Sequence, residues 1–373
     1  MKKILAVFGT RPEAIKLAPV ILRLRGAAGV SVRVCVTAQH REMLDQVLDL
    51  FGIVPDIDLD LMEPDQNLAE LTARVVSRLD GVFRRESPDV VLMQGDTTTV
   101  MAAAMAAFYN RIPVGHVEAG LRSNNLYSPF PEEMNRRVTS IFTHYHFAPT
   151  RNAKEALLKE HIPEDRIFVT GNTVIDALKM ILQRPAPPVV GEILHRAGLN
   201  GDGTSRRMIL VTAHRRENFG EGFESICRGL RSLAERNTDI VIVYPVHLNP
   251  NVREPVTRIL KGHERVLLID PVEYDAMAHL MNASSIILTD SGGIQEEAPT
   301  LGKPALVMRA ETERPEGIEA GTARLVGPDA GRIVEETERL LRDRAAYEEM
   351  AVAVSPYGDG RAAERIVRIL LQQ

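Results

Sequence analysis

The feature that most limits the fold of this chain is a regular alternation between two kinds of segment. Short runs rich in valine, isoleucine and leucine are separated by longer segments in which apolar residues recur with the period of a helix. Parallel strands need a crossover of about a dozen residues or more, and the crossover is usually a helix. The alternation therefore predicts parallel sheets covered by helices, with strands at 4–8, 31–37, 90–93, 114–117, 145–148, 167–170, 208–212, 240–244, 266–269, 285–289 and 305–307.

The alternation is interrupted once, in the middle of the chain. In LQRPAPPVV the prolines at 185, 187 and 188 exclude a regular helix, and the polar stretch NGDGTSRR follows soon after. A chain of 373 residues is also longer than one hydrophobic core usually supports. We therefore expect the α/β class, with two doubly wound Rossmann-like domains that face a central cleft. The expected domains are 1–184 and 185–359, followed by an amphipathic helix in 360–373 that packs back on the first domain.

Composition excludes several classes of function. The formal net charge of -5 gives no general attraction to nucleic acid or to an anionic membrane, so any phosphate site must be local. Cys35 and Cys227 belong to no CxxC motif or Cys/His cluster, and no metal site is expected. The longest apolar helix candidate, 100–109, is too short to span a bilayer. We expect a cytoplasmic protein with no nucleic-acid or membrane partner.

Ligands of open α/β sheets bind beyond the carboxyl ends of the strands, so polar residues that directly follow expected strands are the first candidates. In FGTRPEAIK, Arg11 and Lys16 flank a helix start, where the helix dipole disfavours cations. A bound anion between them would explain their presence, and two solvated basic residues are the alternative. The motif lacks the later glycines of a dinucleotide-binding GxGxxG and the GK[ST] of a Walker loop, which argues against NAD and ATP.

Carboxylates also follow expected strands in the first half of the chain. Asp96 ends QGD, although it could instead cap a helix that starts near Thr98. Glu118, in GHVEAGLRS, directly follows a strand and has no such capping role. In PEEMNR, Glu132 and Glu133 lie in a first helical turn, where acidic residues are favoured in any case, so one of them needs no other explanation. These residues are candidates for acid/base chemistry.

The second half carries a histidine and a glycine-rich turn after its strands. His214 follows a strand in TAHRREN, and His247 repeats the pattern in VYPVHLNP; a structural role is the alternative for each. In LTDSGGIQEEAP, Gly292 and Gly293 let the chain approach a ligand closely where the start of a helix offers unpaired amides to a phosphate.

Glu297 lies one helical turn after Gly293, on the same face, where it can accept hydrogen bonds from two vicinal hydroxyls. Glu296 is rotated by roughly 100° and need not take part. Arg314, in ERPEG, is a further phosphate partner or a structural salt bridge. Together these residues predict a site for a nucleoside diphosphate.

Taken in order, the motifs FGTRPEAIK, QGDTTT, GHVEAGLRS, PEEMNR, TAHRREN, DSGGIQEEAP, ERPEGIEAGT and PYGDGRA resemble the non-hydrolysing bacterial UDP-N-acetylglucosamine 2-epimerases, from about residue 3 to residue 368. The resemblance implies the glycosyltransferase-B architecture and a homodimer. It also implies reversible conversion of UDP-N-acetylglucosamine to UDP-N-acetylmannosamine, without metal or nicotinamide, for cell-surface polysaccharide precursors.

The resemblance also implies roles for individual residues. Those around the sugar and diphosphate would be Arg11, Lys16, Asp96, Glu118, Glu132 and His214. Those that hold UDP would be Ser291, Gly292, Gly293, Glu297 and Arg314, with Val272 and Met277 near the uracil, where relatives often carry Gln and an aromatic residue. A second, activating UDP-N-acetylglucosamine would contact Gln39, His40, Gln66, Arg215 and His247, although Glu42 and Asp65 add negative charge beside it.

The chemistry supports the same reading. The hydrogen at C2 is not α to a carbonyl and is not acidic, so inversion at C2 needs an oxidant or a leaving group. Departure of UDP with loss of the C2 proton gives 2-acetamidoglucal, and readdition gives the epimer. We expect Glu118 and Asp96 to transfer protons, Glu132 to assist them, and His214 to hold or protonate the phosphate. A hydrolysing epimerase, a glycosyltransferase and a nucleotide-sugar sensor without catalytic activity are the alternatives.

Overall fold

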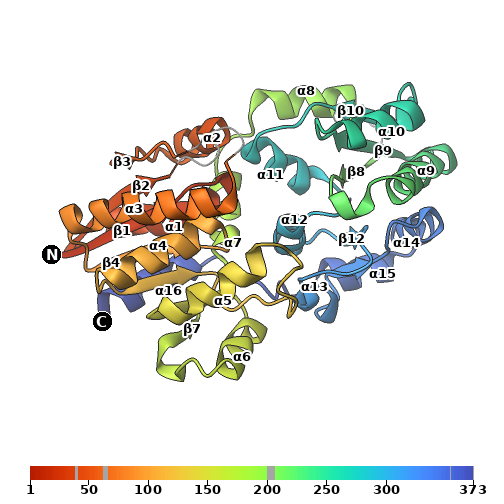
Figure 1. Ribbon diagram of the computed structural model, residues 1–373. Helices are drawn as coiled ribbons and strands as arrows, with labels where there is room; N and C mark the ends of the chain where they lie inside the picture. Colours follow the sequence, from red (N-terminus) through yellow and green to blue (C-terminus); the bar gives the residue numbers. More distant parts are fainter. Residues whose placement is uncertain (38–40, 62–65, 200–205, 353, 373) are drawn as a thin grey trace. The chain divides into compact units, whose positions relative to one another are not determined.

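The computed structural model describes residues 1–37, 41–61, 66–199, 206–352 and 354–372, without the side chains of 41 and 42. The chain forms two compact units, one of Met1–Met180 with Tyr357–Gln373 and the other of Ile181–Pro356 (Figure 1). Each unit is a parallel sheet with helices between successive strands, so the expected α/β class with two doubly wound sheets is confirmed. No helix among the described residues is long and apolar enough to cross a membrane.

The first unit contains a seven-stranded sheet in the order β3-β2-β1-β4-β5-β6-β7. The order reverses between β1 and β4, which makes their carboxyl ends the topological switch point where such sheets bind ligands. The strands are β1 (Lys2–Phe8), β2 (Val30–Val36), β3 (Ile57–Asp58), β4 (Val90–Gln94), β5 (Val114–Val117), β6 (Tyr145–Ala148) and β7 (Ile167–Val169). The helices are α1 (Arg11–Arg25), α2 (Arg41–Phe51), α3 (Leu68–Glu86), α4 (Thr98–Tyr109), α5 (Glu132–Phe142), α6 (Arg151–Lys159), α7 (Thr173–Leu182) and α16 (Ala362–Gln372).

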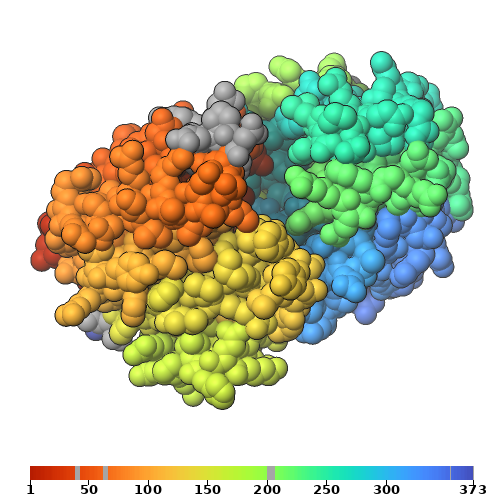
Figure 2. All heavy atoms as spheres, viewed as in Figure 1, coloured from red at the N-terminus to blue at the C-terminus, as the bar shows by residue number. Residues whose placement is uncertain are grey.

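The second unit contains a six-stranded sheet in the order β10-β9-β8-β11-β12-β13, with its switch point between β8 and β11. The strands are β8 (Arg207–Thr212), β9 (Ile240–Pro245), β10 (Val266–Ile269), β11 (Ile286–Thr289), β12 (Ala305–Val307) and β13 (Ala323–Leu325). The helices are α8 (Pro188–Arg196), α9 (Glu221–Arg236), α10 (Pro250–Leu260), α11 (Tyr274–Ala283), α12 (Gly292–Glu297), α13 (Pro315–Glu319), α14 (Ala330–Arg342) and α15 (Arg344–Ala351). Although they are far apart in sequence, α9 and α14 pack side by side, and their surfaces adjoin in Figure 2.

The cores explain why these segments fold as they do. Strands β1 and β4 lie in the middle of the first sheet and are almost wholly buried, which is why they read as continuous apolar runs. Helix α4 is apolar on nearly every side because it is buried where it packs between α3 and α5. The core of the second unit includes the buried Tyr244, whose hydroxyl donates a hydrogen bond to the carbonyl oxygen of Ala213.

Three features differ from the sequence expectation. Strands β3 and β13 were missed because they contain two and three residues, too few for a periodic pattern. The prolines at 187 and 188, which were expected to exclude a regular helix, cap and begin α8, because proline fits the first turn of a helix. The chain leaves the first unit after Met180 and returns to it at Tyr357. The sequence analysis places these two boundaries after residues 184 and 359.

The last helix belongs to the first unit, where it packs on α1 (Figure 1). The buried carboxylate of Asp176 accepts hydrogen bonds from the backbone N–H groups of Ala362 and Ala363 at its start, at 3.1 and 2.9 Å. Near its end, the Lys2 ammonium group donates to the carbonyl oxygen of Leu370 at 2.8 Å. The amphipathic helix expected from residue 360 onward is therefore present.

Candidate active site

The turn between β1 and α1 is built around Glu13, a residue that the sequence analysis did not single out. Its buried carboxylate accepts hydrogen bonds from the backbone N–H groups of Gly9 and Thr10, at 2.8 and 2.7 Å. Arg11 begins α1 and is half-buried, and its side chain makes no hydrogen bond or ion pair with another described residue. An anion bound here would therefore meet the Arg11 guanidinium and not the amides of the turn.

Glu118 directly follows β5, at the carboxyl edge of the first sheet. Its backbone φ is +68°, in the left-handed region that residues other than glycine adopt rarely and at a cost. Lys16, from α1, donates a hydrogen bond to its Oε2 at 2.7 Å, and the side-chain amide of Gln94, at the end of β4, donates to the same oxygen. Lys16 therefore pairs with Glu118 in this structure, and residues of α1 and β4 together hold the carboxylate.

Asp96 lies in the turn after β4 and does not cap the following helix. That role belongs to Thr97, whose hydroxyl accepts a hydrogen bond from the backbone N–H of Val100. The Asp96 carboxylate instead accepts a hydrogen bond from Arg136 at 2.8 Å, and its carbonyl oxygen accepts one from the Asn135 amide at 2.9 Å. The capping alternative is thus excluded, and α5 holds Asp96 at both its side chain and its backbone.

A buried histidine supports the same turn from the neighbouring strand. His116, in β5, lies 2.7 Å through its Nε2 from the carbonyl oxygen of Gly95. Burial lowers the pKa of His116 to about 4, with a small contribution from Arg122 and against the effects of Gly95 and Asp96. The ring is therefore neutral near pH 7, and Nε2 carries the proton that it donates to Gly95.

The adjacent glutamates at the start of α5 have different surroundings. The fully buried Glu133 accepts hydrogen bonds from the backbone N–H groups of Ser123 and Asn124, and it pairs with Arg136 and Arg137. Although burial opposes them, these hydrogen bonds and charges lower the pKa of Glu133. Glu132 is half-buried, and its Oε2 is buried without a hydrogen-bond partner among the described residues. Glu133 is therefore structural, and Glu132 has an oxygen available for a ligand or a proton.

In the second unit, Asp290 organises the turn after β8. This fully buried residue follows β11, and its Oδ2 accepts hydrogen bonds from the backbone N–H groups of His214 and Arg215, both at 2.8 Å. The His214 ring stacks on His247 with 5.5 Å between the ring centres. Burial lowers the pKa of His214, as do Arg215 and His247, while Asp290 opposes them. The two histidines that the sequence marked separately are therefore neighbours.

Two guanidinium groups converge on Gly292, the first residue of α12. A Cβ built on Gly292 would lie 3.7 Å from the Arg215 Nη2 and 3.7 Å from the Arg314 Cζ and Nη2. Arg314 also pairs with the buried Glu296, through its Nε at 2.6 Å. Helix α12 has only six residues, so positive charge at this point comes from the two arginines more than from a helix dipole.

Glu297 also has a protein partner. It is buried, and its Oε1 accepts a hydrogen bond from the Tyr274 hydroxyl of α11 at 2.7 Å. Burial and this carboxylate raise the pKa of Tyr274 well above its usual value, so the phenol stays protonated. Val272 and Met277, the expected uracil neighbours, are half-buried on either side of the start of α11.

The expected activator site is only partly visible. Gln39, His40 and Asp65 lie outside the described residues, as does the side chain of Glu42. Gln66 is half-buried and His247 is exposed. Arg215 lies beside Gly292 with Arg314. The activator site stays a prediction.

Sequence reasoning missed the residues that position the candidates, namely Glu13, Gln94, His116, Asn135, Arg136, Tyr274 and Asp290. One signal was available for Glu13, because Thr10 and Glu13 form the [ST]xxE pattern of a capping box. The others contact their partners across long sequence separations, which no local pattern reveals.

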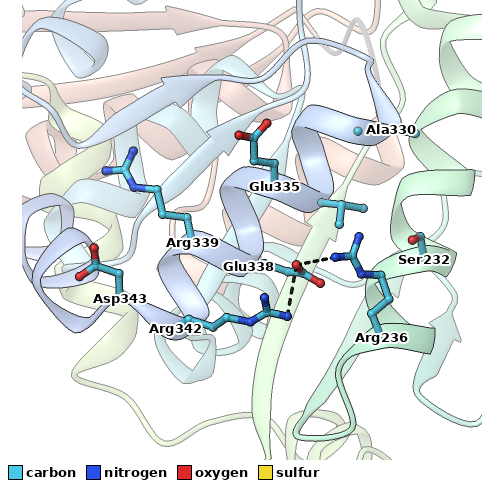
Figure 3. A pocket seen from close by; sticks show the side chains of 10 residues that line it. Ser232, Arg236, Ala330, Glu335, Glu338, Arg339, Arg342 and Asp343 are labelled. Carbon is cyan, nitrogen blue, oxygen red and sulfur yellow. Dashed lines mark hydrogen bonds and ion pairs between the residues drawn. The ribbon is translucent and has the colours of Figure 1, made fainter.

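A large cavity in the second unit is lined by none of the candidate site residues. It measures about 590 Å³ and is lined by residues of α9 and α14 and by Asp343, which follows α14. In Figure 3, Arg236 and Arg342 both point at Glu338, and ion pairs of 2.9 and 3.2 Å join them to its carboxylate. The three arginines of the lining, Arg236, Arg339 and Arg342, are matched in number by three carboxylates, Glu335, Glu338 and Asp343, so the cavity has no net positive charge to bind a phosphate.

Two doubly wound parallel sheets, with carboxylates after the strands of one and two arginines over a glycine turn in the other, define an α/β enzyme of the glycosyltransferase-B class. Residues 22–371 match the family described as UDP-N-acetylglucosamine 2-epimerase. A Yersinia pestis protein of that name is 56% identical over 370 residues, which cover 99% of this chain and 98% of that protein.

Solved structures of the same family are also similar to this chain. The UDP-GlcNAc 2-epimerase from Neisseria meningitidis, bound to UDP-GlcNAc, is 51% identical over the whole of both chains, with a TM-score of 0.92. The S. aureus MnaA–UDP structure is 44% identical, covers 99% of this chain and 96% of that chain, and has a TM-score of 0.89. The chain belongs to the UDP-N-acetylglucosamine 2-epimerase family.

Proposed function

We propose that this chain interconverts UDP-N-acetylglucosamine and UDP-N-acetylmannosamine by elimination and readdition of UDP. The observation that carries the proposal is the convergence of Arg215 and Arg314 on Gly292, a residue with no side chain of its own. Planar guanidinium groups match the geometry of phosphate oxygens. Glu297 lies one turn further along α12, where it can accept hydrogen bonds from the ribose hydroxyls while the Tyr274 hydroxyl steadies it.

The arginines would act on the leaving group. As the C1–O bond breaks, both of its electrons go to the UDP oxygen, and the β-phosphate gains negative charge. Arg215 and Arg314 face the position of that charge, and such prearranged cations stabilise a transition state more than a ground state. His214, whose pKa is lowered mainly by burial, is neutral near pH 7 and would donate a hydrogen bond to the phosphate.

The first unit would supply the proton-transfer groups. Loss of the C2 proton to a carboxylate leaves the electron pair of the C2–H bond as the C1=C2 double bond of 2-acetamidoglucal. A second group then returns a proton to the opposite face of C2 as UDP adds back to C1. Asp96 and Glu118 are the proposed pair, with Glu132 as their helper, because all three follow or flank the carboxyl ends of β4 and β5.

Proton NMR of UDP-N-acetylglucosamine with the pure protein and nothing else tests the proposal. The mannosamine epimer should appear until equilibrium is reached, with or without EDTA and without added NAD. Free N-acetylmannosamine with UDP would indicate a hydrolysing epimerase, and UDP released only with an added acceptor would indicate a glycosyltransferase. Binding without turnover would indicate a sensor, and a strict requirement for a divalent metal or NAD would contradict the elimination.

Isotopes test the route. Product formed in D2O should carry deuterium at C2. Substrate labelled with oxygen-18 in the C1–O–P bridge should scramble the label into non-bridging β-phosphate oxygens, since UDP freed from C1 can rotate before it adds back. Deuteration at C2 with full retention of the bridging label would remove the support for cleavage at C1.

We also propose that the protein is a cytoplasmic homodimer. Support for a dimer comes from an apolar surface at the ends of α4 and α5, where the exposed fractions of Phe108, Tyr109 and Ile141 are 57%, 65% and 74%. The Phe108 ring packs on Phe142 of α5, with 5.1 Å between the ring centres, so the surface is continuous. Sedimentation of the wild type should give a dimer, and the Ile141→Asp and Phe108→Asp variants should shift it toward monomer.

A further inference from the structure

Glu13 joins two turns that lie on either side of the switch point in the first unit. Its Oε2 accepts three hydrogen bonds from the turn after β1, from Gly9 N, Thr10 N and the Thr10 hydroxyl, at 2.8, 2.7 and 2.9 Å. Its Oε1 accepts a fourth, at 2.5 Å, from the hydroxyl of Thr97 in the turn after β4. In a capping box the glutamate makes one hydrogen bond, to the N-cap backbone. Glu13 therefore does more than cap α1.

The second turn is the one that carries Asp96. Thr97 follows Asp96 directly, and the turn is held at two further points, by His116 at the Gly95 carbonyl and by Asn135 at the Asp96 carbonyl. All of these contacts are within the first unit, and Glu13 is only 2% exposed. The backbone around Asp96 is therefore fixed from three directions by side chains that lie outside the turn.

We propose that Glu13 is a positioning residue for the epimerisation, which holds Asp96 at the reacting carbon by tying the turn after β4 to the turn after β1. The inference rests on the proposed function, in which Asp96 transfers a proton at C2. Glu13 itself is buried among hydrogen-bond donors and has no place in the proton transfer. Its effect passes through Thr97 to the neighbouring aspartate.

The hydrogen-bond pattern predicts which substitutions preserve this role. In Glu13→Gln the amide oxygen can keep the three bonds of the first turn, and the amide nitrogen can donate to the Thr97 hydroxyl, which also accepts. Burial raises the pKa of Glu13, so a neutral group is compatible with the site. Glu13→Ala loses all four bonds. Thr97→Val loses only the bond between the turns and the α4 cap, whereas Thr97→Ser keeps both.

The experiment compares these four variants of the full-length enzyme by kcat, KM and the primary isotope effect of C2-deuterated substrate on kcat. Displacement of a reacting group by about 1 Å can cost on the order of a hundredfold in rate. We expect kcat of Glu13→Ala and Thr97→Val to fall about ten- to hundredfold with KM changed less than about threefold. The isotope effect should rise in both, because only the proton transfer is slowed. Glu13→Gln and Thr97→Ser should retain most of kcat.

The matched control is Glu70→Ala. Glu70 is the same third-position glutamate in the capping box of α3, but it is exposed, and among the described residues it contacts no second turn. Its substitution should leave kcat and the isotope effect unchanged. A fall in kcat for Thr97→Val without a rise in the isotope effect, or an unchanged kcat, overturns the positioning role. Because Thr97→Val keeps the first turn intact, the test stands even if Glu13→Ala does not fold.

Asp96→Asn separates this inference from the proposed function. If Asp96→Asn loses activity while Thr97→Val behaves as wild type, the positioning role is wrong and the proposed function stands. If Asp96→Asn keeps wild-type kcat, the role assigned to Asp96 in the proposed function is wrong, and the positioning role falls with it.

Discussion

Replacing Gly292 with alanine should weaken UDP binding while leaving the fold intact. The backbone of Gly292 lies outside the left-handed region that favours glycine, so alanine can adopt it. The new methyl group would lie 3.7 Å from the guanidinium atoms of Arg215 and Arg314, an ordinary van der Waals contact. Alanine also reduces the conformational freedom of the unfolded chain, which is worth about 0.4–1 kcal/mol at a compatible site. The melting temperature should therefore stay the same or rise slightly.

The effect on binding follows from the same geometry. A phosphate oxygen that bonds to both guanidinium groups must enter the space that the methyl group would fill, since charge-assisted bonds of this kind are about 2.7–2.9 Å long. A hydrogen bond to a charged group contributes about 1.5–3 kcal/mol. Loss of one such bond raises Kd by about ten- to a hundredfold, and loss of both raises it further.

Calorimetric titration with UDP is the assay, and Gly293→Ala is the matched control. A Cβ at Gly293 would have only the Ser291 hydroxyl within reach, at 4.0 Å, and neither guanidinium group. We expect a large loss of UDP affinity for Gly292→Ala and a clearly smaller loss for Gly293→Ala. Equal losses for the two variants, or wild-type binding by Gly292→Ala, would refute the placement of the diphosphate between the arginines.

Two further predictions use the buried groups. The pKa of His116 is about 4 in the folded chain, below the 6.5 of an unperturbed histidine, so the unfolded state binds a proton that the folded state does not. Stability should therefore fall as pH drops from 6.5 toward 4, by about 2 kcal/mol at pH 5 from this group, and the urea midpoint of His116→Gln should fall less than that of the wild type. Glu296→Ala leaves Arg314 without its buried partner and should lower the melting temperature, whereas Glu297→Ala removes an acceptor for the ribose and should weaken UDP binding more than it affects stability. Equal melting temperatures for these two variants, with equal UDP affinities, would contradict this division.

The sequence alone determined most of the two sheets. Strands β5, β6, β10 and β12 begin and end at the predicted residues, because runs of buried residues bounded by turn signals define them without reference to their neighbours. Strand β3 pairs only at Cys35–Ile57 and Val36–Asp58, so its existence depends on the strand beside it and not on its own pattern. The role of the prolines before α8 could likewise not be predicted from the local sequence, since proline is found both where a helix is interrupted and where one begins.

Candidate residues followed from a rule that needs only sequence, that polar residues after parallel strands gather at one sheet edge. That rule located Asp96, Glu118 and His214. Which groups pair with them was decided by the tertiary structure: Lys16 meets Glu118 across 102 positions, and Arg136 meets Asp96 across 40. The physical reason is that strand and turn formation depend on neighbours in the chain, whereas the charge and hydrogen bonding of a buried carboxylate depend on neighbours in space.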